Sequence, residues 1–190
     1  MNKPVDVIAK QIRLRPEEVQ SIEKAFTRME CSAGEEILLA GHSRVPDLYF
    51  VESGCLRLYS LDENGEAHNL QFAIEEHWIS DLNAFSQESK ALFGLASLEA
   101  SVLWKISKSN LDHLYQEIPS LERYFRILIQ NAYQQALVRT QMQLQGSATK
   151  RYQYFQSKFP YLIDRIPQYH IASFIGIKPQ SLSRIKSTGN

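Results

Sequence analysis

Short runs of β-type residues, separated by glycine and polar turns, follow one another along the first half of the chain. They cover residues 37–39, 48–51, 55–59, 68–73, 92–98 and 101–106. Most intervals between these runs are too short for a helix, and the pair Asn64-Gly65 is a strong hairpin signal. Repeated short strands at this spacing indicate an antiparallel sandwich or barrel.

Helical patterns lie on both sides of this β region. Residues 5–30 form the first, in which Pro16 marks a helix start. The second begins after Ser107 with a short helix, and a long helix over residues 120–145 follows, ended by Gly146. The expected fold class is α+β: an N-terminal antiparallel β-roll or jelly roll, one long helix and a helical C-terminal domain.

The long helix has one continuous apolar stripe. It consists of Leu121, Phe125, Leu128, Ala132 and Ala136. A helix of about 25 residues spans about 37 Å, which is longer than a small barrel needs to cover one side. Two alternatives follow: the helix packs on its own domain, or it pairs with its twin in a second subunit.

The last part of the chain has the pattern of two short helices joined by a tight turn. Pro167 suits a first helical position, Gly176 suits a helix end with positive φ, and Lys178-Pro179 begins a second helix. Such a pair is typical of a helix-turn-helix, although an ordinary helical hairpin is the alternative. The polar face of the second helix offers groups that can bond phosphates or base edges, namely Lys178, Gln180, Ser181, Ser183 and Arg184.

A formal net charge of zero hides an asymmetry between the two ends of the chain. From Gly146 onward there are seven basic residues and one acid, a charge of +6, which leaves −6 on residues 1–145. A basic module beside an acidic one indicates two different partners. The basic C-terminal part is therefore a candidate for binding a polyanion.

Two motifs and the order of the elements resemble the Crp/Fnr family of bacterial transcription regulators. Gly-Glu-Glu-Ile-Leu at residues 34–38, with Gly41, is similar to the opening of its β-roll, and Tyr-Phe-Val-Glu-Ser-Gly at residues 49–54 is similar to its Tyr-x-Val-x-x-Gly stretch. The resemblance implies three parts. They are a cyclic-nucleotide-binding-like β-roll domain over residues 1–119, a dimerisation helix over 120–146 and a helix-turn-helix domain over 147–190.

The resemblance also implies a mode of action. The family forms homodimers along the long helix, binds double-stranded DNA and places the second helix of its helix-turn-helix in the major groove, with RNA polymerase as a further candidate partner. Pro179, Gln180 and Arg184 match the positions that read bases, with Lys178, Ser181 and Ser183 beside them. Arg184 suits a bidentate contact to guanine and Gln180 suits adenine. Lys150, Arg151 and Lys186 suit phosphate contacts.

The sensor site departs from the family pattern. Cyclic-nucleotide binders carry Gly-Glu-Leu and, about ten residues later, Arg-Ser-Ala, whose arginine pairs with the cyclic phosphate. Here these places hold Ser80-Asp81-Leu82 and Ala91-Leu92-Phe93, so a guanidinium is lacking. We therefore expect that cyclic AMP does not bind tightly. The candidate effector pocket consists of Trp78, Ser80, Asp81, Leu82, Leu92 and Phe93, with Phe85 nearby; filled core is the alternative.

The sequence lacks most of the residue patterns that metal centres and enzyme active sites need. The two cysteines are too few for an iron–sulfur or zinc centre, and the five histidines have no metal-ligand spacing, although an axial haem ligand at His42 or His77 stays open. Nucleophile, phosphate-loop and dinucleotide motifs are missing from the sequence, so we expect neither an enzyme nor a bound cofactor or metal. No signal peptide or membrane span is evident, which predicts a cytoplasmic protein.

Two functions remain at this point. The first is a dimeric transcription regulator whose effector-responsive β-roll controls the placement of two DNA-binding heads. The alternative is a small-molecule-binding or scaffolding β-roll protein with a degenerate C-terminal domain. Only five residues follow Ile185, so the sequence has little room there for additional wing strands.

Overall fold

The computed structural model describes residues 2–188, with side chains as far as Ser187. Eight strands in this range form two antiparallel four-stranded sheets, ordered β1-β8-β3-β6 and β2-β7-β4-β5. The strands are β1 (Thr27–Cys31), β2 (Glu36–Leu38), β3 (Asp47–Ser53), β4 (Leu56–Leu61), β5 (Ala67–Ala73), β6 (Trp78–Ile79), β7 (Gly94–Ser97) and β8 (Ser101–Ser107). The predicted antiparallel β-roll is therefore confirmed.

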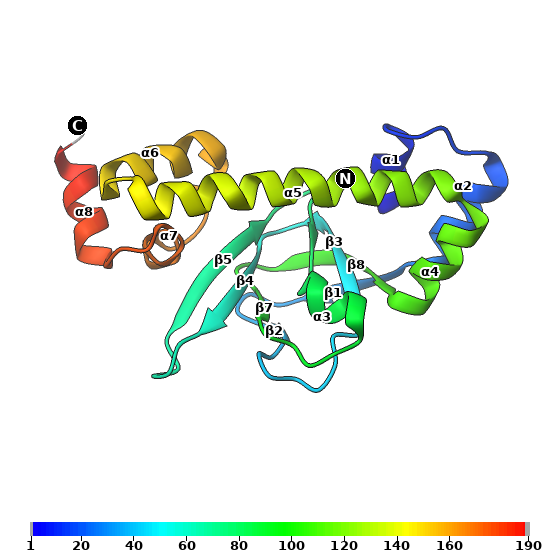
Figure 1. Cartoon of the computed structure of the whole chain (residues 1–190), viewed down its shortest axis with the longest axis horizontal. Helices are drawn as coiled ribbons and strands as arrows, with labels where there is room; N and C mark the ends of the chain where they lie inside the picture. Colours follow the sequence, from blue (N-terminus) through cyan, green and yellow to red (C-terminus); the bar gives the residue numbers. More distant parts are fainter. Residues whose placement is uncertain (1, 189–190) are drawn as a thin grey trace.

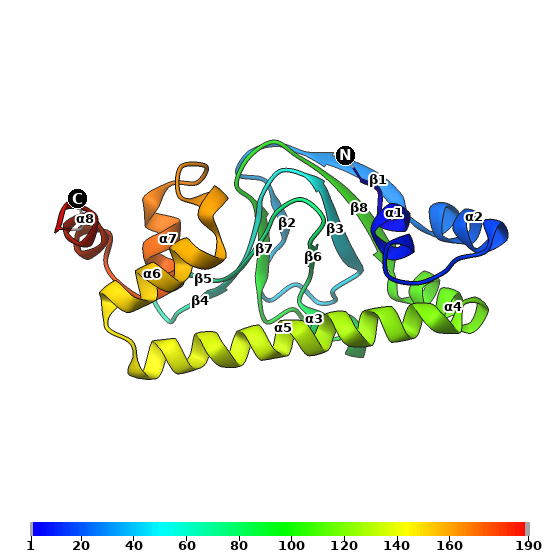
Figure 2. The ribbon, with the colours of Figure 1, turned by 90° about the horizontal axis from the view of Figure 1, so that it is seen from above.

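The helices flank the β-roll at both ends and along one side (Figures 1 and 2). They are α1 (Pro4–Ala9), α2 (Pro16–Ala25), α3 (Leu82–Gln87), α4 (Lys108–Glu117), α5 (Pro119–Gln145), α6 (Ala148–Lys158), the short 3-10 turn η1 (Pro160–Leu162), α7 (Gln168–Ile175) and α8 (Pro179–Thr188). The long helix α5 runs past the sheets, with α1, α2 and α4 near its start and α6, α7 and α8 near its end (Figure 1). The α+β class is confirmed.

The region over residues 5–30 is not all helical, which corrects the sequence-based prediction. Pro16 does begin a helix, but residues 27–31 form β1, which pairs with β8 from Thr27↔Lys105 to Cys31↔Ser101. A strand that completes a sheet gains a full ladder of hydrogen bonds, and this tertiary gain overrides the helical spacing of the apolar residues. The hairpin at Asn64-Gly65 is confirmed: it joins β4 to β5, and Gly65 has a φ of 78°.

The first core lies between the sheets and the helices near the start of α5. Trp78 is at its centre, with ring centroids 5.0 Å from those of Phe50 and Phe125. Its indole N–H donates to the hydroxyl of Tyr124 at 3.0 Å, so the polar atom of this buried ring has a partner. Because Phe125 and Tyr124 belong to α5, this core fixes the first half of the long helix on the β-roll.

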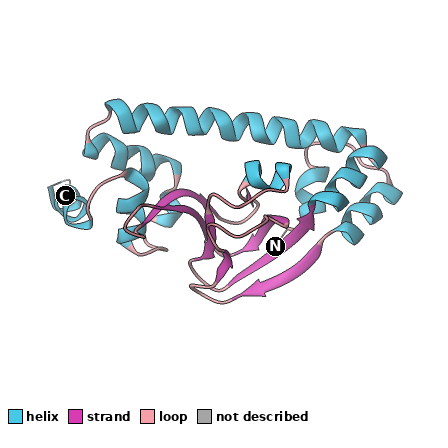
Figure 3. Ribbon diagram, turned by 60° about the horizontal axis from the view of Figure 1, so that its bottom comes forward, coloured by secondary structure: helices cyan, strands magenta, loops and turns pink. Residues whose placement is uncertain are grey.

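A second core lies between the β-roll and the helices that follow α5, which we call the C-terminal helices (residues 148–188; Figure 3). Phe72 of β5 packs against Phe174 of α7 with a centroid distance of 5.2 Å and against Phe155 of α6 at 6.2 Å. Cys55, which precedes β4, is also part of this core. The C-terminal helices are therefore docked on the β-roll through shared apolar contacts.

No helix among the described residues is both long and apolar enough to cross a membrane.

Candidate functional site

The turn between α7 and α8 is built around Gly176. This residue ends α7 with φ 68° and ψ 45°, a left-handed conformation that favours glycine. The N–H of Ile177 then donates to the carbonyl of Ala172 at 3.0 Å, which closes the end of α7. Lys178 accepts hydrogen bonds from the first turn of α8. The predicted pair of helices with a tight glycine turn is thus observed.

Helix α8 has one apolar side and one polar side. Leu182 has no exposed surface and lies in the second core, and Ile185 packs against that core. On the opposite side, Gln180, Ser183 and Arg184 are exposed and share a face, because residues three and four positions apart are neighbours on a helix. α8 lies at the end of the molecule, beyond α6 and α7 (Figure 1). Its polar side is therefore turned outward from the protein.

The other residues predicted to contact DNA lie in or directly before α8 and at the start of α6. Lys178 and Pro179 are exposed at the start of α8, whereas Ser181 and Lys186 are half-buried. Lys150 is exposed in the first turn of α6. Arg151 differs, because its Nη1 donates to the side chain of Gln143 on α5 at 2.7 Å. Its guanidinium holds α6 to α5, so it is less available for a phosphate than the sequence indicates.

The predicted stripe on α5 is divided between two environments. Leu121 and Phe125 are buried in the first core of the same chain, and Leu128 is half-buried against it. Only Ala132 and Ala136 are exposed. The first half of the helix thus packs on its own domain, as one of the two alternatives expected, and its buried residues are not available to a second subunit.

The exposed apolar surface of α5 lies instead on side chains that the stripe left out. Ile129, Tyr133, Leu137, Val138 and Leu144 are between 41% and 80% exposed. The sequence signal was present, because Tyr133, Leu137 and Leu144 follow a spacing of four and seven residues, which is typical of a helix-pairing seam. We call these five residues the α5 apolar face.

The segment that resembles the nucleotide site is closed around the side chain of Asp81. This carboxylate is 1% exposed; Oδ1 accepts from the N–H of Ala84 at 3.2 Å and thereby caps α3. Its Oδ2 accepts from the N–H groups of Leu92 and Phe93 at 2.8 and 3.2 Å. Three backbone donors therefore surround one buried carboxylate, a role that the Asp-x-x pattern before a helix signals in the sequence.

The residues of the candidate effector pocket lie in different surroundings. Trp78 and Phe85 are buried in the first core, where the filled-core alternative holds. Ser80 is also buried, and its hydroxyl donates to the carbonyl of Asp47 at 2.8 Å. Leu82 and Leu92 are exposed at 39% and 61%. A cavity of about 210 Å³ lies elsewhere; its lining includes Ile22, Phe26 and Trp104, next to α1 and α2.

One group among the described residues brings potential metal ligands together. Asp62, Glu66 and His68 lie at the exposed tip of the β4–β5 hairpin. The Asp62 carboxylate already accepts from the N–H groups of Asn64 and Glu66, both at 2.9 Å, and His68 Nε2 lies 3.2 Å from it. These contacts form the hairpin turn, and they engage the side chains of Asp62 and His68.

Residues 28–118 match the family described as the cyclic nucleotide-binding domain. Among solved structures, the c-di-GMP-responsive global regulator CLP from Xanthomonas campestris is similar to this chain, with 12% identity, a TM-score of 0.75 and coverage of 92% of this chain and 91% of that chain. FixK2 from Bradyrhizobium japonicum has 15% identity and a TM-score of 0.75, with coverage of 86% and 83%.

The catabolite activator protein of Thermus thermophilus has 19% identity and a TM-score of 0.60, with coverage of 93% of this chain and 84% of that chain. No curated protein sequence matches this chain. The similar structures are regulators, and each shares most of its length with this chain. Residues 28–118 therefore form a domain of the cyclic nucleotide-binding family, and the whole chain has the fold of the Crp/Fnr family that its sequence resembles.

Proposed function

We propose that this chain is a DNA-binding transcription regulator of the Crp/Fnr type, in which α7 and α8 are a helix-turn-helix and α8 is the recognition helix. The observation that carries this proposal is the outward polar face of α8. Gln180, Ser183 and Arg184 share that face, while Leu182 holds the opposite side in the second core. A recognition helix that enters a major groove needs one side packed against its own domain and a polar side exposed to the DNA.

The charge of the C-terminal part supports the same function. Residues 146–190 carry +6, whereas the rest of the chain carries −6. Helix α8 has no acidic residue in its first turn, so the positive end of its dipole and Lys178 are both available to a phosphate. Lys150 adds an exposed cation at the start of α6. Contacts of this kind supply affinity that falls with salt and carries no sequence information.

Sequence readout falls to two side chains of α8. The guanidinium of Arg184 suits the O6 and N7 acceptors of guanine, and the amide of Gln180 suits adenine. Pro179 has no side-chain hydrogen-bond donor, so it starts the helix and makes apolar contact. We expect Ser181, Ser183 and Lys186 to contact the backbone of the DNA.

Homodimer formation is the second part of the proposal. The α5 apolar face offers Tyr133 and Leu137, 63% and 51% exposed, at the spacing that pairs two helices. An exposed apolar row on a helix of 27 residues is costly in water, and a second copy removes it by a two-fold contact. Such a pair carries two copies of α8, as recognition of two half-sites about 34 Å apart demands.

The third part concerns the effector, and we propose that cyclic AMP is not bound. The carboxylate of Asp81 already accepts hydrogen bonds from the N–H groups of Leu92 and Phe93. Ala91 offers no cation at the place where the family pattern has arginine. Isothermal titration of the full chain with cyclic AMP tests this directly: we expect no binding, and micromolar affinity would contradict the proposal.

Selection of bound duplexes from a random library, followed by fluorescence anisotropy on the enriched sequence, tests DNA binding. We expect a palindromic site, with an affinity that falls steeply between 50 and 200 mM salt, as is usual for several phosphate contacts. Arg184→Ala should weaken binding about tenfold or more and relax the preference at one base position. Lys24→Ala removes the same charge from an exposed position on α2 and serves as the control.

Failure of the selection to enrich any sequence at low salt would favour the scaffolding alternative. Equal losses for Arg184→Ala and Lys24→Ala would mean that the basic charge, and not α8, carries the binding.

A further inference from the structure

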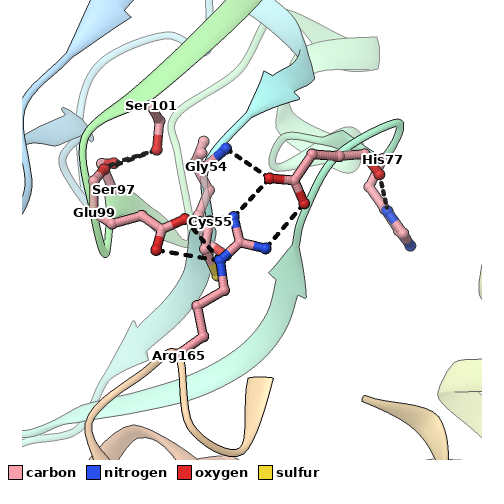
Figure 4. Close-up of polar contacts among 9 residues, drawn as sticks. Gly54, Cys55, His77, Ser97, Glu99, Ser101 and Arg165 are labelled. Carbon is pink, nitrogen blue, oxygen red and sulfur yellow. Dashed lines mark hydrogen bonds and ion pairs between the residues drawn. The ribbon is translucent and has the colours of Figure 1, made fainter. Parts of the chain in front are cut away.

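Arg165 joins the C-terminal helices to the β-roll. It lies in the connection between η1 and α7, and its guanidinium reaches two carboxylates (Figure 4). Nη1 and Nη2 donate to the two oxygens of Glu75 at 3.0 and 2.6 Å, and Nε and Nη2 donate to Oε1 of Glu99 at 2.9 and 2.5 Å. Contacts with two donor atoms fix the orientation of an arginine as well as its distance. We call these three residues the Arg165 triad.

The two carboxylates of the triad are themselves held by the β-roll. Glu75 follows β5, and its Oε1 also accepts from the N–H of Gly54 at 3.0 Å. Gly54 has a φ of 106°, and a Cβ there would lie 2.0 Å from the hydroxyl of Ser101, so only glycine fits. Glu99 follows β7. The triad thus rests on three neighbouring loops at one end of the sheets (Figure 4).

The charges of the triad make it dependent on the arginine. The Arg165 guanidinium, through its hydrogen bonds, lowers the pKa of Glu75 to about 2. The Glu75 carboxylate is therefore charged at neutral pH, and the carboxylates of Glu75 and Glu99 both contact the one guanidinium. Loss of that cation leaves two like charges facing each other, which repel. Because both carboxylates belong to the β-roll, Arg165 supplies the cation of the triad from the C-terminal side of the junction.

The apolar part of the same junction covers a thiol. Cys55 has no exposed surface and lies in the second core beside the Arg165 triad (Figure 4). The other members of that core include Phe155 and Phe174 of the C-terminal helices. Burial raises the pKa of the Cys55 thiol to about 12, which keeps it protonated and unreactive. The thiol becomes accessible only when the C-terminal helices move away from the β-roll.

The covalent connection does little to orient these helices. Only Gly146 and Ser147 separate α5 from α6, and both have extended backbone conformations. Two residues between two helices act as a pivot. The direction of α8 relative to the long helix therefore depends on docking contacts. The Arg165 triad is one of the charged contacts among them.

We propose that Arg165 is an interdomain latch, which holds the C-terminal helices, and with them α8, in one orientation on the β-roll. The regulatory meaning of the latch rests on the proposed function, since α8 is there the element that reads DNA. When the triad is broken, the C-terminal helices leave the β-roll by rotation at Gly146 while the β-roll itself stays folded. Arg165 acts as a positioning residue for α8.

The reactivity of the two native cysteines tests the latch without any DNA. Cys31 belongs to the first core and Cys55 to the second, so labelling of Cys31 reports opening of the β-roll, whereas labelling of Cys55 reports undocking. The full chain is incubated with a thiol reagent at 50 mM salt, and both sites are quantified by peptide mass spectrometry. The variants are Arg165→Gln and, as a matched control, Lys158→Gln, an exposed lysine on α6.

We expect Arg165→Gln to raise the labelling rate of Cys55 about tenfold or more, with Cys31 unchanged, and Lys158→Gln to leave both rates as they are. Equal acceleration at both cysteines would mean general destabilisation and would overturn the latch, as would an unchanged rate at Cys55. If Arg165→Gln fails to fold, the labelling rates of Cys55 and Cys31 are measured in Glu99→Gln, with the same expected result and the same contradicting results. Because no DNA is present, this outcome is independent of whether the chain binds DNA.

Discussion

The carboxylate of Asp81 accepts a hydrogen bond from the backbone N–H of Leu92 at 2.8 Å, across eleven residues of sequence. The same side chain caps α3, so one carboxylate ties the start of that helix to the segment that leads into β7. The backbone N–H groups of Leu92 and Phe93 therefore already donate to a carboxylate of the protein and are not open to an anionic group of a ligand. The β-roll therefore keeps the shape of a nucleotide-binding domain with this part of its site satisfied from within.

Asp81→Ala should destabilise the β-roll. It leaves the N–H groups of Ala84, Leu92 and Phe93 without their acceptor, and each buried unsatisfied donor costs about 1–3 kcal/mol. Partial access of water reduces the sum, so we expect a loss of about 3 kcal/mol in the free energy of unfolding, measured with urea. Asp164→Ala, an exposed carboxylate, is the control; similar losses for both variants would contradict the structural role of Asp81.

The interface of α7 with β5 should respond to acid through His170. This residue is 5% exposed, and burial, with the charge of Arg57 nearby, lowers its pKa to about 4. Its Nδ1 lies 3.2 Å from Nδ2 of Asn69, and neutral His170 accepts that amide hydrogen. Protonation of Nδ1 would place two donors against each other. The folded state therefore favours neutral His170.

The sign of the pH effect follows from these pKa values. Between about pH 6.5 and 4 the unfolded chain binds a proton that the folded chain does not, so stability is full above this window and falls as the pH falls through it. The slope from this one group is at most about 1.4 kcal/mol per pH unit. Urea unfolding from pH 7 to 4.5 measures it. His170→Gln should flatten the curve; an identical slope in both proteins would contradict the assignment.

Arg139 of α5 should contribute strongly to docking. Its guanidinium donates to the carbonyls of Leu70, Asn69 and Phe174, and its centre lies 4.2 Å from the centroid of the Phe174 ring. Arg139→Ala leaves these carbonyls without a charged donor, and we expect a loss of about 2–3 kcal/mol in the free energy of unfolding. Arg126→Ala, exposed on the same helix, should cost less than about 0.5 kcal/mol.

Much of the fold follows from local patterns in the sequence. Asn64-Gly65, Pro16 and Gly176 each mark a turn or a helix end whose reason lies in one residue's backbone preferences, and all three are found where the sequence predicts them. The strand β1 was missed because it is stabilised by pairing with a segment that is distant in the sequence. Its residues pair with β8 about seventy positions away, and nothing within residues 27–31 signals that partner.

The same distinction separates the candidate sites. The face of α8 could be predicted because Gln180, Ser183 and Arg184 are neighbours by helical period alone. Arg165 and Arg139 could not, since an isolated arginine in a sequence does not indicate whether it faces water, DNA or a carboxylate 90 residues away. The predicted stripe and the α5 apolar face differ for another reason: two rows of apolar residues lie on one helix, and the position of the β-roll decides which residues are buried.

Leu137→Glu should dissociate the proposed dimer while leaving the fold intact. Leu137 is 51% exposed at the middle of the α5 apolar face, and in a symmetric helix pair the substitution would place two carboxylates close together in an apolar seam. We expect wild-type protein to sediment as a dimer and Leu137→Glu as a monomer, with unchanged circular dichroism. Gln135→Glu adds the same charge at an exposed position of α5 that lies two residues from Leu137, on another side of the helix, and should remain dimeric. A wild-type monomer at tens of micromolar, or a dimer that survives Leu137→Glu, would show that a different surface joins the subunits.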